Sequence, residues 1–125
     1  MREKPELDIE TAERAGYPVV RVRGIVDFRT SPRLRSALRR WVEKELTGGI
    51  INLTGVQKID TTGVATIAET MQDMGGSARL VLVNDSSGTR RALELSGMAD
   101  CCERCSSEDD AAAILEGGGQ GGGTS

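Results

Sequence analysis

Apolar and polar residues alternate along the first part of the chain with a period of two, as they do in half-exposed strands. Residues 6–14 alternate weakly and predict an edge strand, while residues 17–26 alternate valine with arginine in a second strand. Gly16, Tyr17 and Pro18 predict the turn between them. Because that turn is tight, we expect the two strands to be antiparallel.

The period then changes to that of an amphipathic helix. Ser31 and Pro32 predict its start, with Ser31 as the N-cap and Pro32 in the first helical position, and Gly48-Gly49 predicts its end. The apolar positions of this helix follow the spacing i, i+3, i+4, i+7, i+8 and are Leu34, Ala37, Leu38, Trp41 and Val42.

The rest of the chain repeats this change of period. A short apolar strand over 50–53 and a loop from Gly55 lead to a second helix, whose entrance is at residues 60–63 and whose end is at Gly75-Gly76. Residues 80–83 are apolar throughout, which is typical of a parallel strand covered on both faces. The remaining predicted elements are a helix over 85–96 with Gly97 as its C-cap, a strand over 101–105, and a helix over 107–115 capped by Ser107.

Strands that alternate with helices from about residue 17 onward predict an α/β domain. We expect a mixed, mostly parallel sheet of about four or five strands with about four helices. Residues 1–116 are predicted to form this domain, and the glycine-rich residues 117–125 to form a disordered tail.

Composition removes several classes of function. The 125 residues include no histidine, which excludes Ser-His and Cys-His nucleophile pairs and histidine-ligated metals. A net charge of −3 argues against nucleic-acid binding. The N-terminus lacks the apolar stretch of a signal peptide, and no apolar run approaches the ~20 residues that span a bilayer. We expect a cytoplasmic protein without membrane insertion, cofactor, metal or enzymatic activity.

Cys101, Cys102 and Cys105 cluster in one short segment. A metal or redox function for Cys102 and Cys105 is the competing interpretation, but a four-ligand zinc site would need further ligands. We favour reduced, buried thiols in the last strand.

The chemistry-bearing residues gather at the entrance of the second helix, where Asp60, Thr61, Thr62 and Gly63 follow a strand. A helix N-terminus can accommodate a phosphate, and a hydroxyl there can carry one. The alternative is that these hydroxyls only satisfy free backbone N–H groups. Asn52, inside the preceding strand, is predicted to brace the loop before Asp60.

Four motifs in this order carry a resemblance to a known family. They are Gly24-Ile25-Val26-Asp27, the segment Ile50 to Val56, the segment Ile59 to Val64, and Leu95-Ser96-Gly97-Met98. Together they resemble the STAS domain, the fold of bacterial anti-sigma factor antagonists and of stressosome proteins, over residues 6–116.

The resemblance implies a site and a function. Thr61 takes the position of the phosphoacceptor, with Thr62 as the lesser candidate, and Asp60 serves as both cap and recognition residue. Asp27, Phe28 and Gly63 are the other members of the partner-binding set, although Phe28 could instead plug the core. The implied function is partner switching: the protein binds an anti-sigma factor that is a serine/threonine kinase, is released when phosphorylated, and is reset by a phosphatase.

A second function remains open at this point. The chain could be a STAS-type stressosome scaffold or a transporter-associated subunit that phosphorylation does not control. We favour a single-domain antagonist that is a monomer or weak dimer.

Overall fold

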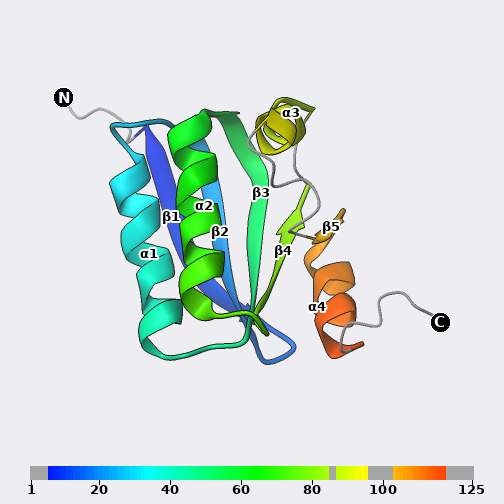
Figure 1. Ribbon diagram of the computed structural model, residues 1–125. Helices are drawn as coiled ribbons and strands as arrows, with labels where there is room; N and C mark the ends of the chain where they lie inside the picture. The colour runs from blue at the N-terminus through cyan, green and yellow to red at the C-terminus, as the bar shows by residue number, and fades with distance from the viewer. Residues whose placement is uncertain (1–5, 85–86, 96–102, 118–125) are drawn as a thin grey trace.

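The computed structural model describes residues 6–84, 87–95 and 103–117. In this part of the chain a five-stranded sheet has the order β1-β2-β3-β4-β5 (Figure 1). β1 is antiparallel to β2, and the other neighbours are parallel, so the predicted mixed, mostly parallel sheet is confirmed. The elements are β1 (Leu7–Arg14), β2 (Tyr17–Val26), α1 (Ser31–Glu43), β3 (Gly48–Ile59), α2 (Thr61–Met74), β4 (Arg79–Val83), α3 (Ser87–Leu95), β5 (Glu103–Cys105) and α4 (Glu108–Glu116).

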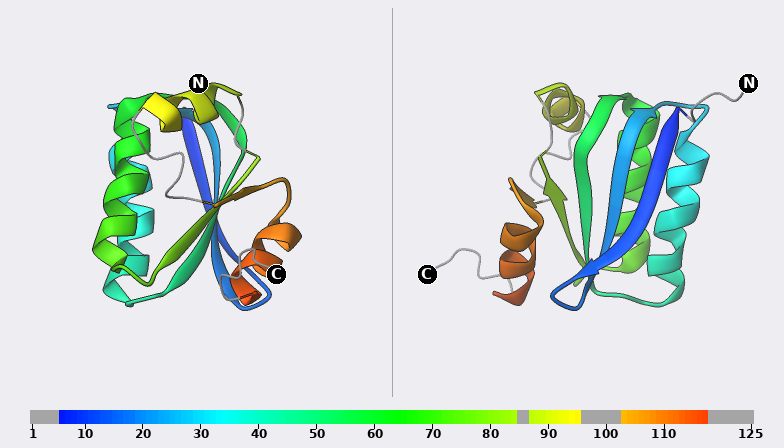
Figure 2. Two further views of the ribbon diagram at one scale, coloured as in Figure 1. Left: turned by 45° about the vertical axis from the view of Figure 1, so that its right-hand side comes forward. Right: turned by 180° about the vertical axis from the view of Figure 1, so that it is seen from behind.

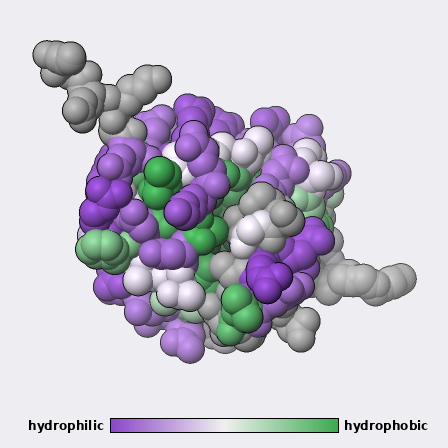
Figure 3. All heavy atoms as spheres, turned by 90° about the horizontal axis from the view of Figure 1, so that it is seen from above, coloured by the Kyte–Doolittle hydropathy of each residue, from purple (hydrophilic) through white to green (hydrophobic). Residues whose placement is uncertain are grey.

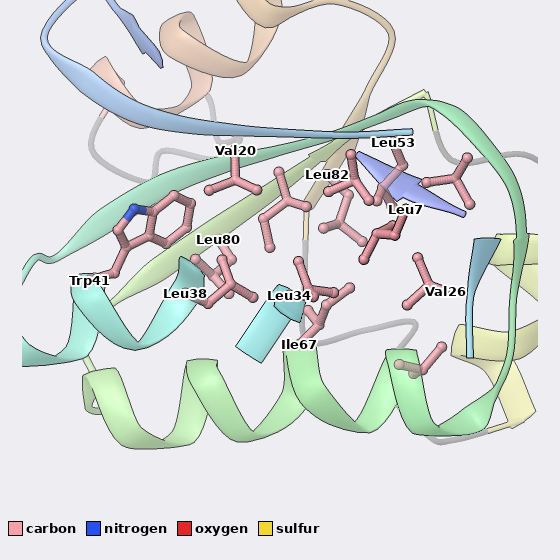
Figure 4. Packing of buried hydrophobic residues seen from close by; sticks show 14 residues of the cluster. Leu7, Val20, Val26, Leu34, Leu38, Trp41, Leu53, Ile67, Leu80 and Leu82 are labelled. Carbon is pink, nitrogen blue, oxygen red and sulfur yellow. The ribbon is translucent and has the colours of Figure 1, made fainter. Parts of the chain in front are cut away.

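The helices cover the sheet unequally. α1 and α2 lie side by side on one face, α4 lies on the other, and α3 sits beside the end of the sheet at which α2 begins (Figure 2). The main core fills the space between the sheet and the pair α1 and α2 (Figure 4). Its labelled members are Leu7, Val20, Val26, Leu34, Leu38, Trp41, Leu53, Ile67, Leu80 and Leu82. A smaller cluster under α4 includes Val19, Ile50, Val81, Ala111 and Leu115.

The first hairpin turns one residue earlier than predicted. Ala15 and Gly16 both have positive φ, 54° and 87°, and form a two-residue turn between Arg14 and Tyr17. Such a turn matches the right-handed twist of the flanking strands. Tyr17 and Pro18 therefore belong to β2, and the predicted turn over residues 16–18 was wrong by this shift.

α1 differs from its prediction at both ends. Thr30 is the N-cap, so Ser31 is already helical, and the helix ends at Glu43 rather than at Gly48-Gly49. Gly49 lies in β3, where an added Cβ would stand 2.4 Å from the Trp41 ring. The glycine pair thus serves close packing of strand on helix and not helix termination.

β3 is longer than the predicted strand over 50–53, because pairing with β2 continues to Ile59. Two register shifts along β2 accommodate the extra length. Gly55, predicted to open a loop, is a strand residue whose absent Cβ would stand 2.6 Å from Arg23 Cγ. Close approach of a cross-strand side chain explains a glycine inside a strand.

Behind the sheet, Glu108 in the first turn of α4 is a buried carboxylate with several donors. Its Oε2 accepts from Arg21 Nε and from Asn52 Nδ2, both at 2.7 Å, and its Oε1 accepts from Arg14 Nη2 at 3.3 Å. The hydrogen bond from Arg21 and that from Asn52 outweigh burial and lower the pKa of Glu108 to about 2. Ion pairs therefore fasten the last helix to the first hairpin.

The C-terminal part follows the prediction at the start of α4. Ser107 is the N-cap of α4, with Oγ accepting from Asp110 N at 3.0 Å, as expected. Cys105 lies in β5, where it is half-buried rather than buried as expected, and its Sγ donates to Ser107 O at 3.3 Å. Gly97, Cys101, Cys102 and residues 118–125 lie outside the described residues. Across the described ranges, no helix has both the length and the apolar character needed to cross a membrane.

Candidate functional site

The carboxyl ends of β2 and β3 meet at one end of the sheet, at the top of Figure 1. Asp60 N, just past β3, donates to Val26 O at the end of β2 across 3.0 Å. Asp27 and Asp60 thus follow two adjacent parallel strands. We call the surface formed by Asp27, Phe28, Asp60, Thr61 and Thr62 the α2 entrance.

Asp60 is the N-cap of α2. Its Oδ1 accepts from Thr62 N at 2.9 Å, from Gly63 N at 3.1 Å and from the Thr62 hydroxyl at 2.6 Å. The carboxylate satisfies two backbone donors that the helix itself leaves unpaired, and its charge lies at the positive end of the helix dipole.

The two threonines differ in what their hydroxyls do. Thr62 Oγ1 donates to Asp60. Thr61, the first residue of α2, is exposed, and within the described ranges no hydrogen bond to its hydroxyl is formed. Of these two hydroxyls, that of Thr61 is the one on an exposed residue that forms no hydrogen bond with the described residues.

Gly63 permits close packing beneath the entrance. It is buried, and an added Cβ would stand 2.5 Å from Val26 Cγ1 and 2.8 Å from Ile59 Cγ1. The first turn of α2 can lie directly on the ends of β2 and β3 only because this side chain is missing. Gly63 acts on the site through the backbone and presents no side chain to a partner.

Asp27 is held by the turn that follows β2. Its Oδ1 accepts from Arg29 N at 2.9 Å and from Thr30 N at 3.2 Å, and its Oδ2 accepts from Arg29 Nη2 at 3.1 Å. Desolvation acts to raise the pKa of Asp27, but the hydrogen bonds from Arg29 and Thr30 outweigh it and hold that pKa below its ordinary value. Asp27 is thus held ionised at the entrance, in an ion pair with Arg29.

Arg29 and Thr30 were not predicted from the sequence as site residues. Arg29 bridges Asp27 and Glu6 with its guanidinium, and Thr30 Oγ1 donates to Ile25 O at 2.8 Å. The signal for Thr30 was present, because an aspartate followed three residues later by threonine is typical of a side-chain-capped turn. Nothing in the local pattern distinguishes Arg29 from the neighbouring arginines of α1.

Phe28 is 71% exposed, which removes the alternative that it plugs the core. Leu95, at the end of α3, is the other large apolar side chain that is exposed in the described part of the chain, at 75%. Figure 3 shows this end of the molecule, where apolar surface in the middle is rimmed by hydrophilic residues. The entrance therefore combines fixed charge with apolar surface.

Asn52 braces a different part of the structure than predicted. Its amide donates to Glu108, and its Oδ1 accepts from Thr54 N at 2.9 Å. It holds β3 to α4 and does not touch Asp60 through these bonds. Among the described residues, no three side chains of His, Cys, Asp or Glu come together as a metal site.

Comparison of the sequence with known protein families identifies the family to which this chain belongs. The family model described as the STAS domain matches residues 8–111. The chain belongs to the STAS domain family. The anti-sigma-F factor antagonist RsfB of Mycobacterium tuberculosis is 27% identical to this STAS domain over 112 residues, which cover 90% of this chain and 92% of RsfB.

Solved structures show the same fold. An anti-sigma factor antagonist from Mycobacterium paratuberculosis superposes with a TM-score of 0.81 at 24% identity, covering 92% of this chain and 99% of that one. The anti-sigma factor antagonist SpoIIAA in its unphosphorylated form gives 0.73 at 18% identity, covering 87% and 97%. The Bacillus protein SpoIIAA in its phosphorylated form gives 0.66 at 20% identity, covering 86% and 98%. This chain therefore shares its fold with SpoIIAA in both its unphosphorylated and its phosphorylated form.

Proposed function

We propose that this STAS domain is a cytoplasmic anti-sigma factor antagonist that works by partner switching. Unphosphorylated, it binds an anti-sigma factor that is also a serine/threonine kinase. Phosphorylation of Thr61 releases it, and a phosphatase restores the binding form. The named relatives support antagonism, and the site geometry supports Thr61 as the acceptor.

One observation carries the choice of residue: the Thr61 hydroxyl is exposed and unengaged, whereas the neighbouring hydroxyl of Thr62 is bound to Asp60. A kinase must bring the acceptor oxygen in line with the γ-phosphate of ATP. For Thr62 this would first break its bond to Asp60. Thr61 needs no such rearrangement.

Phosphate at Thr61 changes the charge of the entrance more than its shape. It adds about −1.5 to −2 charges at neutral pH. The helix N-terminus accommodates them, while Asp60 and Asp27 already contribute negative charge to the same surface. A partner that docks against Phe28 and these carboxylates would then meet like-charge repulsion, without any refolding of the domain.

Phosphorylation is tested with the cognate kinase and ATP. We expect label on the wild type and on Thr62→Ser, and none on Thr61→Ala, with the site assigned by mass spectrometry. Thr62→Ser is the matched control because it keeps a hydroxyl bound to Asp60. Equal label on Thr61→Ala and the wild type would assign the phosphate elsewhere.

Partner binding is tested by a pull-down that compares the wild type with Thr61→Glu and Thr61→Val. The wild type and Thr61→Val should retain a kinase-type anti-sigma factor, and Thr61→Glu should lose it. Capture of the same partners by all three proteins would contradict the switch. Mass in solution separates the scaffold alternative, since we expect a monomer or weak dimer rather than a large assembly.

A further inference from the structure

Residues of the edge strand β1 and of helix α1 line a groove at the edge of the sheet. The right-hand view of Figure 2 shows these two elements next to each other. The volume of the groove is about 330 Å³. It is lined by Ile9 and Thr11 from β1 and by Arg33, Ser36, Ala37 and Arg40 from α1. The four helical positions follow the spacing i, i+3, i+4, i+7 and form one stripe of α1 that overhangs the edge of the sheet. None of these residues belongs to the α2 entrance.

The floor of this groove is a strand edge with free hydrogen-bonding positions. Ile25 N donates to Glu6 O, just before β1 begins. In the register of this antiparallel pair, the even-numbered residues of β1 are therefore the ones whose backbone groups bond to β2. Along an antiparallel pair, alternate residues turn their N–H and C=O groups away from the partner strand. Leu7, Ile9 and Thr11 therefore point these groups outward, and Leu7 O already accepts from Arg33 Nη1 at 2.6 Å.

The wall of the groove carries two positively charged side chains, those of Arg33 and Arg40. On the other side of α1, Arg35 pairs with Glu69 at 3.1 Å and Arg39 pairs with Asp73 at 3.0 Å. Within residues 6–84, 87–95 and 103–117, neither Arg33 nor Arg40 forms an ion pair with an acidic side chain. In a chain of net charge −3, two such arginines beside an open strand edge favour an acidic ligand.

A second copy of this chain is a less favourable occupant of the groove than an acidic segment. Edge-to-edge pairing of two β1 strands about a twofold axis would bring the α1 stripes of the copies together, with Arg33 and Arg40 of one facing those of the other. Two of the three acidic side chains of β1, Asp8 and Glu10, do not relieve this repulsion. Asp8 and Glu10 alternate with Ile9 and lie on the opposite face of the sheet, where they pair with Arg23 and Arg21.

We propose that this groove docks an extended acidic segment of a partner protein, which adds to β1 as a sixth strand. Its backbone pairs with the outward N–H and C=O groups of Ile9 and Thr11. Its acidic side chains on the α1 side contact Arg33 and Arg40, and guanidinium groups suit such contacts because they bind carboxylates through two parallel hydrogen bonds. The site is separate from the α2 entrance, so binding here does not depend on Thr61.

The experiment measures fluorescence anisotropy of a labelled peptide of about eight residues in which glutamate alternates with valine. A second peptide with lysine in place of each glutamate is the charge control. We expect the acidic peptide to bind the wild type and Thr61→Ala equally, and the basic peptide not to bind. The absence of binding by the acidic peptide up to millimolar concentration, or equal binding of both peptides, would overturn the proposal.

Two pairs of variants test the two contacts. Arg40→Gln should weaken binding about two- to fivefold, whereas Arg39→Gln, with the same change in charge on the other side of α1, should leave it within about twofold. Thr11→Pro removes an outward N–H without breaking a bond to β2, and should weaken binding about fivefold or more. Thr11→Val keeps that N–H and should bind as the wild type does.

Circular dichroism of each variant confirms that it is folded before binding is compared. If folded Thr11→Pro binds the acidic peptide as well as Thr11→Val does, strand addition is wrong. If the wild type forms a dimer that Thr11→Pro abolishes, the occupant of the edge is a second copy and the proposal is wrong.

Discussion

Asp60 Oδ1 accepts a hydrogen bond from the Thr62 hydroxyl at 2.6 Å, and the same oxygen caps the first turn of α2. One acidic side chain thus fixes the helix entrance and leaves Thr61 as the free hydroxyl of the pair. The stability of α2 and the proposed choice of Thr61 as the phosphoacceptor both depend on Asp60 Oδ1.

Replacing Asp60 with alanine should therefore destabilise the protein by about 1 kcal/mol, through loss of the cap. Urea unfolding followed by circular dichroism measures the change. Asp60→Ser, which retains an acceptor oxygen in the N-cap position, is the control and should recover most of the loss. An unchanged urea midpoint for Asp60→Ala would show that the cap does not stabilise the domain.

Gly63→Ala should cost about 1–3 kcal/mol, because the new Cβ meets Val26 and Ile59 at distances that require the strand ends to move. The better helix propensity of alanine offsets up to about 1 kcal/mol of this. Gly76→Ala is the matched control, since nothing lies within 4 Å of its added Cβ. Thermal unfolding of both variants checks the prediction, which fails if the two melt together.

Glu108 should make stability depend on pH in the acid range. Its pKa is lowered from 4.5 to about 2 by folding, so its contribution is complete above about pH 4.5 and is lost as the pH falls toward 2. Glu108→Gln should destabilise the protein at pH 7 by about 2 kcal/mol, because it weakens the hydrogen bonds from Arg21 and Asn52.

Urea unfolding at pH 7 and pH 2.5 measures this dependence. The difference between the wild type and Glu108→Gln should shrink at the lower pH. Asp109→Asn changes the adjacent carboxylate, whose side chain is 80% exposed, and should have little effect at either pH. A difference that stays constant between the two pH values would contradict the assignment to Glu108.

Phe28→Ala should separate binding from folding. Because the ring is 71% exposed, its loss should change the free energy of unfolding by less than about 0.5 kcal/mol. If the α2 entrance docks the proposed kinase, affinity should fall by about 1 kcal/mol or more, as for other aromatic interface residues. Isothermal titration with the purified partner measures this, with Leu95→Ala as a second exposed apolar variant; unchanged affinity for Phe28→Ala would remove Phe28 from the docking surface.

The sequence predicted the structure well at positions where a residue acts only on its neighbours along the chain. The Asp60 and Ser107 caps, the end of α2 at Gly75 and the apolar strand β4 could all be predicted, because capping chemistry and hydrophobic period act over a few residues. The glycines were the main source of error. Gly49 and Gly55 serve contacts with Trp41 and Arg23, which lie far from them in the local pattern.

The site shows the same division between local and distant contacts. The family resemblance alone ranks Thr61 above Thr62 as the expected phosphoacceptor, but the hydrogen bond from the Thr62 hydroxyl to Asp60, which gives a physical reason for that order, is visible only in the folded structure. The bridge from Arg29 to Glu6 spans 23 residues, and the contact between Asn52 and Glu108 spans 56. The spacing of apolar and polar residues along the chain cannot predict contacts between residues so far apart in the sequence.

The ion pair between Arg14 and Glu108 joins residues 94 positions apart, near opposite ends of the described chain. During synthesis the first hairpin leaves the ribosome long before α4 exists. Until then Arg14 and Arg21 have no carboxylate from the last helix, and the sheet face beneath it is uncovered. The face of the sheet that α4 covers is therefore the last to be buried during synthesis. A ribosome that stalls before residue 108 would leave this face exposed to chaperones and proteases.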